Sequence, residues 1–128
     1  MDNKDFNVIY SYTREQAIED GVLVDLTREA QESGFKIPVA MSAGLYFGYV
    51  KPSKALEAEG QSVQARLNDV FIMLRFAAKD RWDGSRVEFE VLFQVGEGPS
   101  FQKVSCVAAV EGDSDGNPCL TIFRPEDD

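Results

Sequence analysis

Histidine is absent from this chain of 128 residues. That absence excludes the side chain most used for general acid–base catalysis near neutral pH, together with Ser-His and Cys-His nucleophile pairs and His-containing zinc sites. The two cysteines, Cys106 and Cys119, are too few to complete a tetrahedral thiolate site or a disulfide framework. An enzyme built on this sequence would therefore depend on carboxylates, Lys, Tyr or Arg.

Long apolar runs are also lacking. No stretch approaches the roughly 20 apolar residues that a membrane-spanning helix needs, and the start, MDNKDFNVIYSYT, has neither a basic beginning nor a continuous apolar segment. We therefore expect a cytoplasmic protein that does not bind membranes. Because thiols stay reduced in that compartment, Cys106 and Cys119 are predicted to be buried free thiols. If the strands that carry Cys106 and Cys119 pair, a disulfide between the two residues is geometrically possible, and the sequence leaves this alternative open.

Basic side chains are outnumbered by acidic ones, 13 against 22, which gives a formal charge of −9. The excess lies at the ends: residues 1–34 hold eight acids and three bases, residues 87–128 nine acids and two bases, and residues 35–86 five acids and eight bases. An acidic surface repels phosphate backbones, so direct nucleic-acid binding is not expected. The charge suits a basic protein partner, or it only keeps the protein in solution; both interpretations stay open.

The first segment has capping and terminating residues that predict two short helices, one on each side of a strand. Thr13 and Gln16 fit a capping box, which predicts a helix over 14–20. The β-branched run 22–26 predicts a strand, and a second helix is expected to start at Thr27 and end at Gly34. The polar residues of this segment therefore have local structural roles.

Four tyrosines are candidate ligand-binding residues. Tyr10 and Tyr12 share one side of an extended segment. Tyr46 and Tyr49 belong to an aromatic patch on a helix predicted over 43–50. Such rings line a ligand cleft or pack in the core, and aromatic side chains at helical spacing are typical of cores.

Several segments resemble a known family. IYSYTREQAIEDGVLVD and EAQESGFKIPVAMS, with RLNDVFIMLRFAA and RVEFEVLF further along, are similar to a family of small uncharacterised proteins from bacteria, phages and plasmids. The resemblance covers about residues 8–95, and the segment after 96 lies outside it. It implies a bacterial or mobile-element origin, and it brings no activity, cofactor or catalytic residue with it.

The longest helix is predicted over 62–81. One continuous apolar stripe follows its 3.6-residue period: Val63, Leu67, Val70, Phe71, Leu74, Ala77 and Ala78. Ile72 and Phe76 lie nearly opposite the centre of that stripe. A helix that is apolar on two sides is either sandwiched inside the monomer, which we expect here, or lends its second side to a partner. Pro38, further upstream, predicts an edge strand or a loop.

The segment 86–95 alternates with a period of two and predicts a half-buried antiparallel strand. Glu88 and Glu90 share its polar face, where a pair of carboxylates could hold a metal or act in catalysis, although strand alternation alone explains them as the solvent side. The segment DSDGN at 113–117, with Asp113 and Asp115, matches the start of a calcium-binding loop, but the residues that follow it do not match that loop. A hairpin turn therefore accounts for the segment better.

These patterns predict an α+β, two-layer fold, in which short N-terminal helices and one long helix pack on a small antiparallel sheet ending in a three-stranded meander. We expect residues 1–128 to form a single globular domain, with 123–128 as a flexible acidic tail. No pattern points to a cofactor or a resident metal.

Three functions stay open. The first is a non-catalytic protein-binding or regulatory module that steers a basic partner with acidic side chains, namely Glu88, Glu90, Asp113 and Asp115. The second is a small-ligand binder, or a carboxylate- or tyrosine-based enzyme, at the four tyrosines. The third is a homodimer joined through Ile72 and Phe76 on the second side of the long helix.

Overall fold

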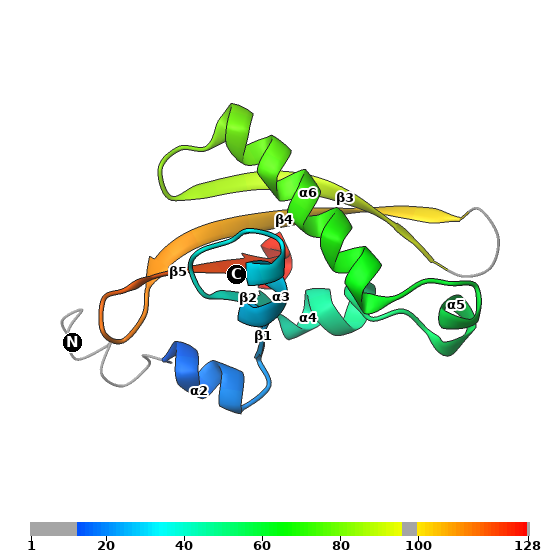
Figure 1. Cartoon of the computed structure of the whole chain (residues 1–128), viewed down its shortest axis with the longest axis horizontal. Helices are drawn as coiled ribbons and strands as arrows, with labels where there is room; N and C mark the ends of the chain where they lie inside the picture. The colour runs from blue at the N-terminus through cyan, green and yellow to red at the C-terminus, as the bar shows by residue number, and fades with distance from the viewer. Residues whose placement is uncertain (1–12, 96–99, 128) are drawn as a thin grey trace.

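A five-stranded mixed sheet organises the molecule (Figure 1). The computed structural model describes residues 13–95 and 100–127. The sheet has the order β1-β2-β5-β4-β3, in which β2 and β5 are parallel and the other neighbours antiparallel. Its strands are β1 (Leu23–Asp25), β2 (Val39–Ser42), β3 (Arg86–Gln94), β4 (Phe101–Gly112) and β5 (Pro118–Phe123). The predicted α+β class and the β3-β4-β5 meander are confirmed, whereas the predicted antiparallel sheet is mixed, because β2 pairs with β5 in parallel.

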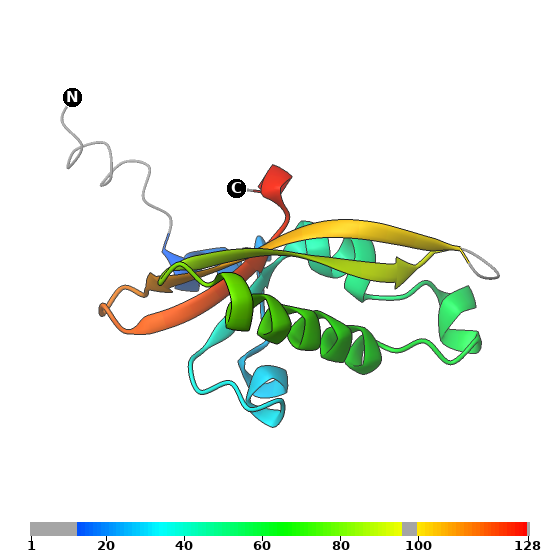
Figure 2. The same cartoon turned by 90° about the horizontal axis from the view of Figure 1, so that it is seen from above.

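The long helix lies across one face of this sheet, together with a shorter helix, while the last turn of the described chain lies on the other face (Figure 2). Those three elements are α6 (Val63–Arg81), α3 (Thr27–Glu32) and the 3-10 turn η2 (Pro125–Asp127). The remaining helical segments are α2 (Arg14–Glu19), α4 (Ala43–Leu45), the π-helical turn η1 (Tyr46–Val50) and α5 (Lys54–Ala58). We call the face under α6 the inner face and the opposite one the outer face.

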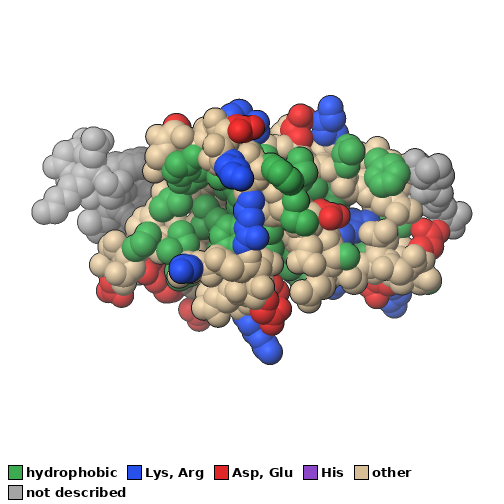
Figure 3. All heavy atoms as spheres, turned by 45° about the horizontal axis from the view of Figure 1, so that its top comes forward, with side chains coloured by type: hydrophobic (Ala, Val, Ile, Leu, Met, Phe, Trp, Pro, Cys, Tyr) green, Lys and Arg blue, Asp and Glu red, His purple; other side chains and the backbone are tan. Residues whose placement is uncertain are grey.

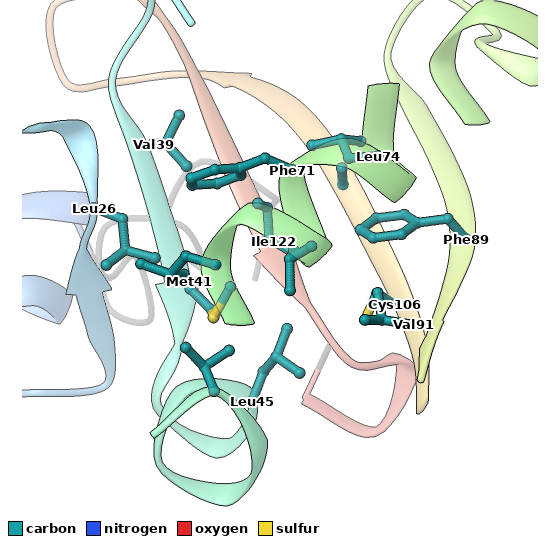
Figure 4. Packing of buried hydrophobic residues seen from close by; sticks show 14 of the residues in the cluster. Leu26, Val39, Met41, Leu45, Phe71, Leu74, Phe89, Val91, Cys106 and Ile122 are labelled. Carbon is teal, nitrogen blue, oxygen red and sulfur yellow. The ribbon is translucent and has the colours of Figure 1, made fainter. Parts of the chain in front are cut away.

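The main core fills the space between α6 and the inner face (Figure 4). The strand alternation of β3 is confirmed, because its apolar positions are buried in turn with exposed ones. The predicted stripe of α6 is also buried along most of its length, from Leu67 to Ala77. Large side chains from distant segments meet there, including Met41, Leu45, Phe71, Phe89 and Ile122.

The N-terminal capping box is confirmed. The Gln16 backbone N–H donates to the Thr13 hydroxyl at 3.0 Å, and the Thr13 N–H donates to the Gln16 side chain at 3.2 Å. The second helix begins as predicted, and its first helical residue is Thr27. Its hydroxyl donates to the Asp25 carboxylate at 2.6 Å and accepts from the Val39 N–H at 3.1 Å, which ties the start of α3 to β2.

Pro38 itself lies in a loop, as one of the two predicted alternatives has it, but the strand that follows it is not an edge strand. β2 lies inside the sheet, between β1 and β5, and all four of its residues are buried. Pro38 precedes the strand, so its missing N–H costs no bond of the ladder. Its carbonyl accepts from the Leu120 N–H at 2.8 Å.

The turn between β4 and β5 is a hairpin turn, as predicted. The Asp113 carboxylate accepts from the backbone N–H groups of Asp115 and Asn117, each at 2.9 Å. Gly116 supplies the positive φ, 82°, that the turn requires. This carboxylate therefore serves the turn itself.

The interpretation of 123–128 as a flexible tail does not fit residues 123–127. Phe123 is the buried last residue of β5, and Pro125–Asp127 form η2. The Asp127 carboxylate accepts from the Ser42 hydroxyl at 2.7 Å and pairs with Arg124 at 2.8 Å. Polarity alone suggested a tail, whereas hydrogen bonds to a distant strand end hold this segment.

Candidate interaction site

The outer side of α6 carries an uncovered apolar surface. Phe76 is 66% exposed, Ile72 49% and Met73 40%. The expectation that Ile72 and Phe76 are buried inside the monomer is therefore wrong. The sheet covers only one side of α6, and in the described part of the chain no second layer covers the other. Hydrophobic side chains gather on this side of the molecule among acidic and basic ones (Figure 3).

Beside this surface lies the free edge of β3, the last strand of the sheet. Arg81 donates to the carbonyl of Glu88 at 2.9 Å, and Arg66 donates to the carbonyl of Gln94. Because carbonyls of alternate residues point to the same edge of an antiparallel strand, those of Glu90 and Leu92 share this edge. Two arginines of α6 thus bond to carbonyls at the two ends of this edge, and no described strand pairs with the stretch between them.

An open hollow of about 350 Å³ lies where α6 meets this edge. α6 contributes Asp69, Ile72 and Met73, and β3 contributes Glu90, Val91 and Leu92. Lys103 of β4, which is opposite Leu92 in the register, completes the wall.

A second hollow, of about 440 Å³, continues along α6 at Ile72, Arg75, Phe76 and Lys79. We call the two hollows together the α6 groove. Leu92 is 59% exposed, so large apolar side chains border the groove from both α6 and β3. Hydrocarbon with a few charges at its rim suits the docking of a protein surface.

Arg66, which joins α6 to η1 and to the end of β3, is a residue that the sequence analysis missed. It is only 3% exposed, and its guanidinium donates to the carbonyls of Tyr49 and Gln94. Its Nε is buried without a hydrogen-bond partner among the described residues. Burial lowers the pKa of Arg66, and the Asp69 carboxylate partly opposes that shift. Its spacing, one residue before Leu67, places it at the margin of the apolar stripe and was the available signal.

A separate cleft of about 510 Å³ lies on the outer face, between β1, the start of α4 and η2. Ser42, Glu111, Thr121 and Asp127 give it polar walls. The Ser42 hydroxyl, which donates to Asp127, also accepts from the Leu45 N–H at 3.2 Å, capping α4. The Arg124 hydrogen bond lowers the pKa of Asp127 to about 2, so this carboxylate is charged and occupied at neutral pH. The hydrogen bond of Ser42 with Asp127 and the ion pair of Arg124 with Asp127 are therefore structural contacts in this conformation.

The predicted tyrosine site is not assembled by the described residues. Tyr10 and Tyr12 lie outside them. Tyr46 packs edge-on against Phe47, with ring centroids 5.0 Å apart, and Tyr49 packs against Phe93 at 5.7 Å. Neither lines the α6 groove or the outer-face cleft. The rings of Tyr46 and Tyr49 therefore pack against neighbouring aromatic side chains.

The predicted acidic residues do not form one patch. Glu88 and Glu90 lie on the exposed face of β3, and Glu90 also reaches the wall of the α6 groove. Asp113 and Asp115 lie in the hairpin turn, eight residues or more along β4 from the partner of Glu90, roughly 25 Å away at about 3.3 Å per residue. Steering by these residues would act from two separate places.

Both cysteines are buried free thiols, as predicted. Burial raises the pKa of Cys106 to about 12 and also raises the pKa of Cys119. Among residues 13–95 and 100–127, no three side chains of metal-ligating type come together. None of the described helices is both long enough and apolar enough to cross a membrane.

Fold and surface define a small α+β protein in which one long helix lies across a five-stranded mixed sheet. The chain belongs to the family described as "Family of unknown function (DUF6573)", whose model matches residues 3–128. The expected family resemblance is confirmed, but its range is wider than 8–95, because the C-terminal strands belong to the match. No curated protein and no solved structure matches the chain.

Proposed function

We propose that this protein is a non-catalytic protein-binding module and that the α6 groove is its docking surface. The observation that carries the proposal is the exposure of Phe76 and Ile72 at the centre of the groove. A phenyl ring held in water by a long, well-anchored helix gains free energy when a partner covers it, about 1.5–3 kcal/mol for full burial. A contiguous exposed apolar surface is typical of interaction sites.

Rigidity of the groove supports the same function. α6 is anchored by its buried stripe and by Arg66, which ties it to η1 and β3. A binding surface that is fixed before its partner arrives loses less conformational entropy on association. Met73 and Phe76 supply the adaptable and the rigid apolar contact that partner surfaces commonly use.

Charge supports a partner that presents a basic surface. The formal charge of −9 sets up a long-range field that attracts positive surfaces. Glu90 lines the groove, and Glu88 lies two residues before it on the same exposed face of β3. In this proposal they act on the rate of encounter, while the apolar groove holds the complex. In this proposal the module works in the cytoplasm of a bacterium or of a cell carrying a mobile element. The buried free thiols support the compartment, and the resemblance noted from the sequence supports the origin.

The test compares two exposed phenylalanines. The immobilised chain is incubated with lysate of the source cell at low and at moderate salt, and Phe76→Asp is compared with Phe47→Asp. Phe47 is 58% exposed on η1, outside the groove, and is thus a matched control. We expect Phe76→Asp to lose the retained protein and Phe47→Asp to keep it. Equal retention by both variants would show that the groove is not the docking surface.

A small-ligand binder is the second candidate, favoured by the outer-face cleft with its polar walls of Ser42, Glu111 and Thr121. Leu23 also lines this cleft, and Leu23→Trp would fill it. Small molecules that bind there would raise the melting temperature of the natural chain and leave that of Leu23→Trp unchanged. A screen in which both proteins respond alike would remove this candidate.

A further inference from the structure

The exposed side of α6 carries a stripe with alternating spacings of three and four residues: Asp69, Ile72, Phe76 and Lys79. All four side chains are exposed. Residues at such spacings form one seam along a helix, which is how the contact positions of a two-helix coiled coil are arranged. The seam covers about 15 Å of the helix at about 1.5 Å per residue.

Charge along this seam has a direction. An acidic side chain, Asp69, lies at its N-terminal end, and a basic one, Lys79, lies at its C-terminal end. The groove walls repeat that order, because Glu90 lies in the hollow with Asp69 and Arg75 in the hollow with Lys79. Lys103 of β4 lines the same hollow as Asp69 and Glu90, so the acidic end of the groove includes one basic side chain, whereas the seam residues of α6 keep the order from acidic to basic.

The four seam positions are symmetric about Leu74. Ile72 and Phe76 lie two residues on either side of Leu74, and Asp69 and Lys79 lie five residues on either side. An identical helix laid antiparallel on α6, with a twofold axis at this point, therefore places Ile72 against Phe76 of the second copy. The same axis places each Asp69 against a Lys79, so both ends of the seam are neutralised together. The basic surface that the acidic end attracts is then the Lys79 end of the second copy, and this local pairing opposes the long-range repulsion between two copies that each carry a formal charge of −9.

We propose that the occupant of the α6 groove is a second copy of this chain, bound through an antiparallel pair of α6 helices. The inference rests on the proposed function and names its partner. A self-complementary surface is what an isologous dimer requires, since the same patch must serve both subunits. An added strand fits the site less well, because Arg66 and Arg81 close the edge of β3 on either side of Glu90 and Leu92.

Charge reversals test the geometry, with sedimentation velocity as the measurement. Asp69→Lys places two lysine side chains against each other at each end of the seam, and Lys79→Asp places two carboxylates there. We expect a dimer of the natural chain at about 100 µM, and a dissociation constant raised by roughly tenfold or more in each variant. An equimolar mixture of the two variants restores opposite charges at the seam in a heterodimer, and the double variant restores them within one homodimer.

The two charge reversals change the net charge in opposite directions, and this distinguishes an effect of net charge from an effect of the seam geometry. Asp69→Lys changes the formal charge of each copy from −9 to about −7, and Lys79→Asp changes it to about −11. Overall repulsion alone would make the first variant dimerise more strongly and the second less, whereas the seam requires both to weaken. Lys54→Asp, at an exposed lysine of α5, is the control for the second variant and stays dimeric.

A natural chain that is monomeric at about 100 µM would overturn the dimer. Dimers that survive both reversals, or single variants whose mixture stays monomeric, would overturn it as well. These failures are distinct from failure of the proposed function. If the chain is a monomer but still captures another protein through Phe76, the docking surface is retained and only the second copy is excluded as its occupant. If the chain is a monomer and Phe76→Asp does not affect capture, both the docking surface and the dimer are excluded.

Discussion

The hydroxyl of Ser42 donates a 2.7 Å hydrogen bond to the carboxylate of Asp127, 85 residues further along the chain. The same hydroxyl accepts from the Leu45 N–H and so caps α4. Asp127 in turn accepts from the side chain and the backbone N–H of Arg124. One small hydrogen-bonded cluster thus joins the end of β2, the start of α4 and the last described turn of the chain.

The Asp127 cluster predicts a loss of stability at low pH. The pKa of Asp127 is lowered to about 2 in the folded protein from an ordinary value of 3.8, chiefly by Arg124. Its stabilising effect is therefore complete above pH 3.8 and is lost as the pH falls through about 2. Asp127→Asn should lower the free energy of unfolding by about 1 kcal/mol at pH 7, since solvent screens a partly exposed pair.

Urea unfolding between pH 7 and pH 2.5, over the range in which both proteins stay folded, measures this difference. We expect the gap between the natural chain and Asp127→Asn to narrow as the pH falls. Asp115→Asn, in the exposed hairpin turn, removes the same charge and serves as control. A gap that is independent of pH would contradict the role of the ionised carboxylate.

Gly44 is predicted to be required where the Asp127 cluster approaches α4. A Cβ added at Gly44 would meet the Arg124 guanidinium and lie 2.9 Å from Asp127 Oδ1, whereas one added at Gly48 would meet nothing within 4 Å. The ends of the Arg124 and Asp127 side chains would have to move apart, so Gly44→Ala should cost about 1 kcal/mol, mainly through loss of their pair.

The control is Gly48→Ala, which should be neutral or stabilising by up to about 1 kcal/mol because alanine favours helix. A double-mutant cycle makes the test specific. Once Asp127→Ala has removed the pair, Gly44→Ala should cost clearly less than in the natural chain. Additive costs would mean that Gly44 matters for another reason.

Local patterns predicted the parts of this fold that depend on neighbours in the sequence. The Thr13 capping box, the alternation of 86–95 and the stripe of α6 were all found because each rests on a few adjacent residues. The parallel pairing of β2 with β5 joins segments about 80 residues apart, and no periodicity encodes such a partner. For that reason the inner position of β2, directly after Pro38, could not be predicted from the sequence.

The candidate site was predicted in part. Periodicity identified Ile72 and Phe76 as a second apolar side of α6, but whether another layer covers that side depends on topology. Arg66 was missed because its polarity suggested solvent, although its helical position lies beside the buried stripe. The seam from Asp69 to Lys79 became meaningful only when the exposed side of α6 was known.

Arg66 is predicted to be the most sensitive charged residue of the helix. Arg66→Met removes the guanidinium that donates to the carbonyls of Tyr49 and Gln94, which should cost about 2–4 kcal/mol. Arg66→Lys should cost about 2 kcal/mol as well, because one ammonium group does not reproduce the guanidinium fork. Arg81→Met removes a single exposed hydrogen bond and should cost less than about 1 kcal/mol.

Urea unfolding of the three variants at pH 7 measures these costs. Comparable losses for Arg66→Met and Arg81→Met would mean that the buried guanidinium is no more important than an exposed one. Recovery of stability in Arg66→Lys would show that charge, rather than the two-carbonyl fork, holds η1 against β3.

Cys106 and Cys119 are predicted to be unreactive while the protein is folded. The thiolate is the reactive form, and with the Cys106 pKa raised to about 12 by burial it is a small fraction near pH 8, about one part in ten thousand. The pKa of Cys119 is raised in the same direction by burial. Ellman's reagent at pH 8 should therefore label neither thiol within minutes in native buffer and both in concentrated urea. Fast labelling of Cys119→Ser in native buffer would show that Cys106 is reached by solvent, and fast labelling of Cys106→Ser would show the same for Cys119. If the thiols react in the folded protein, raising the pH should increase the labelling rate in proportion to the thiolate fraction. If unfolding limits the labelling rate instead, that rate should increase with added urea.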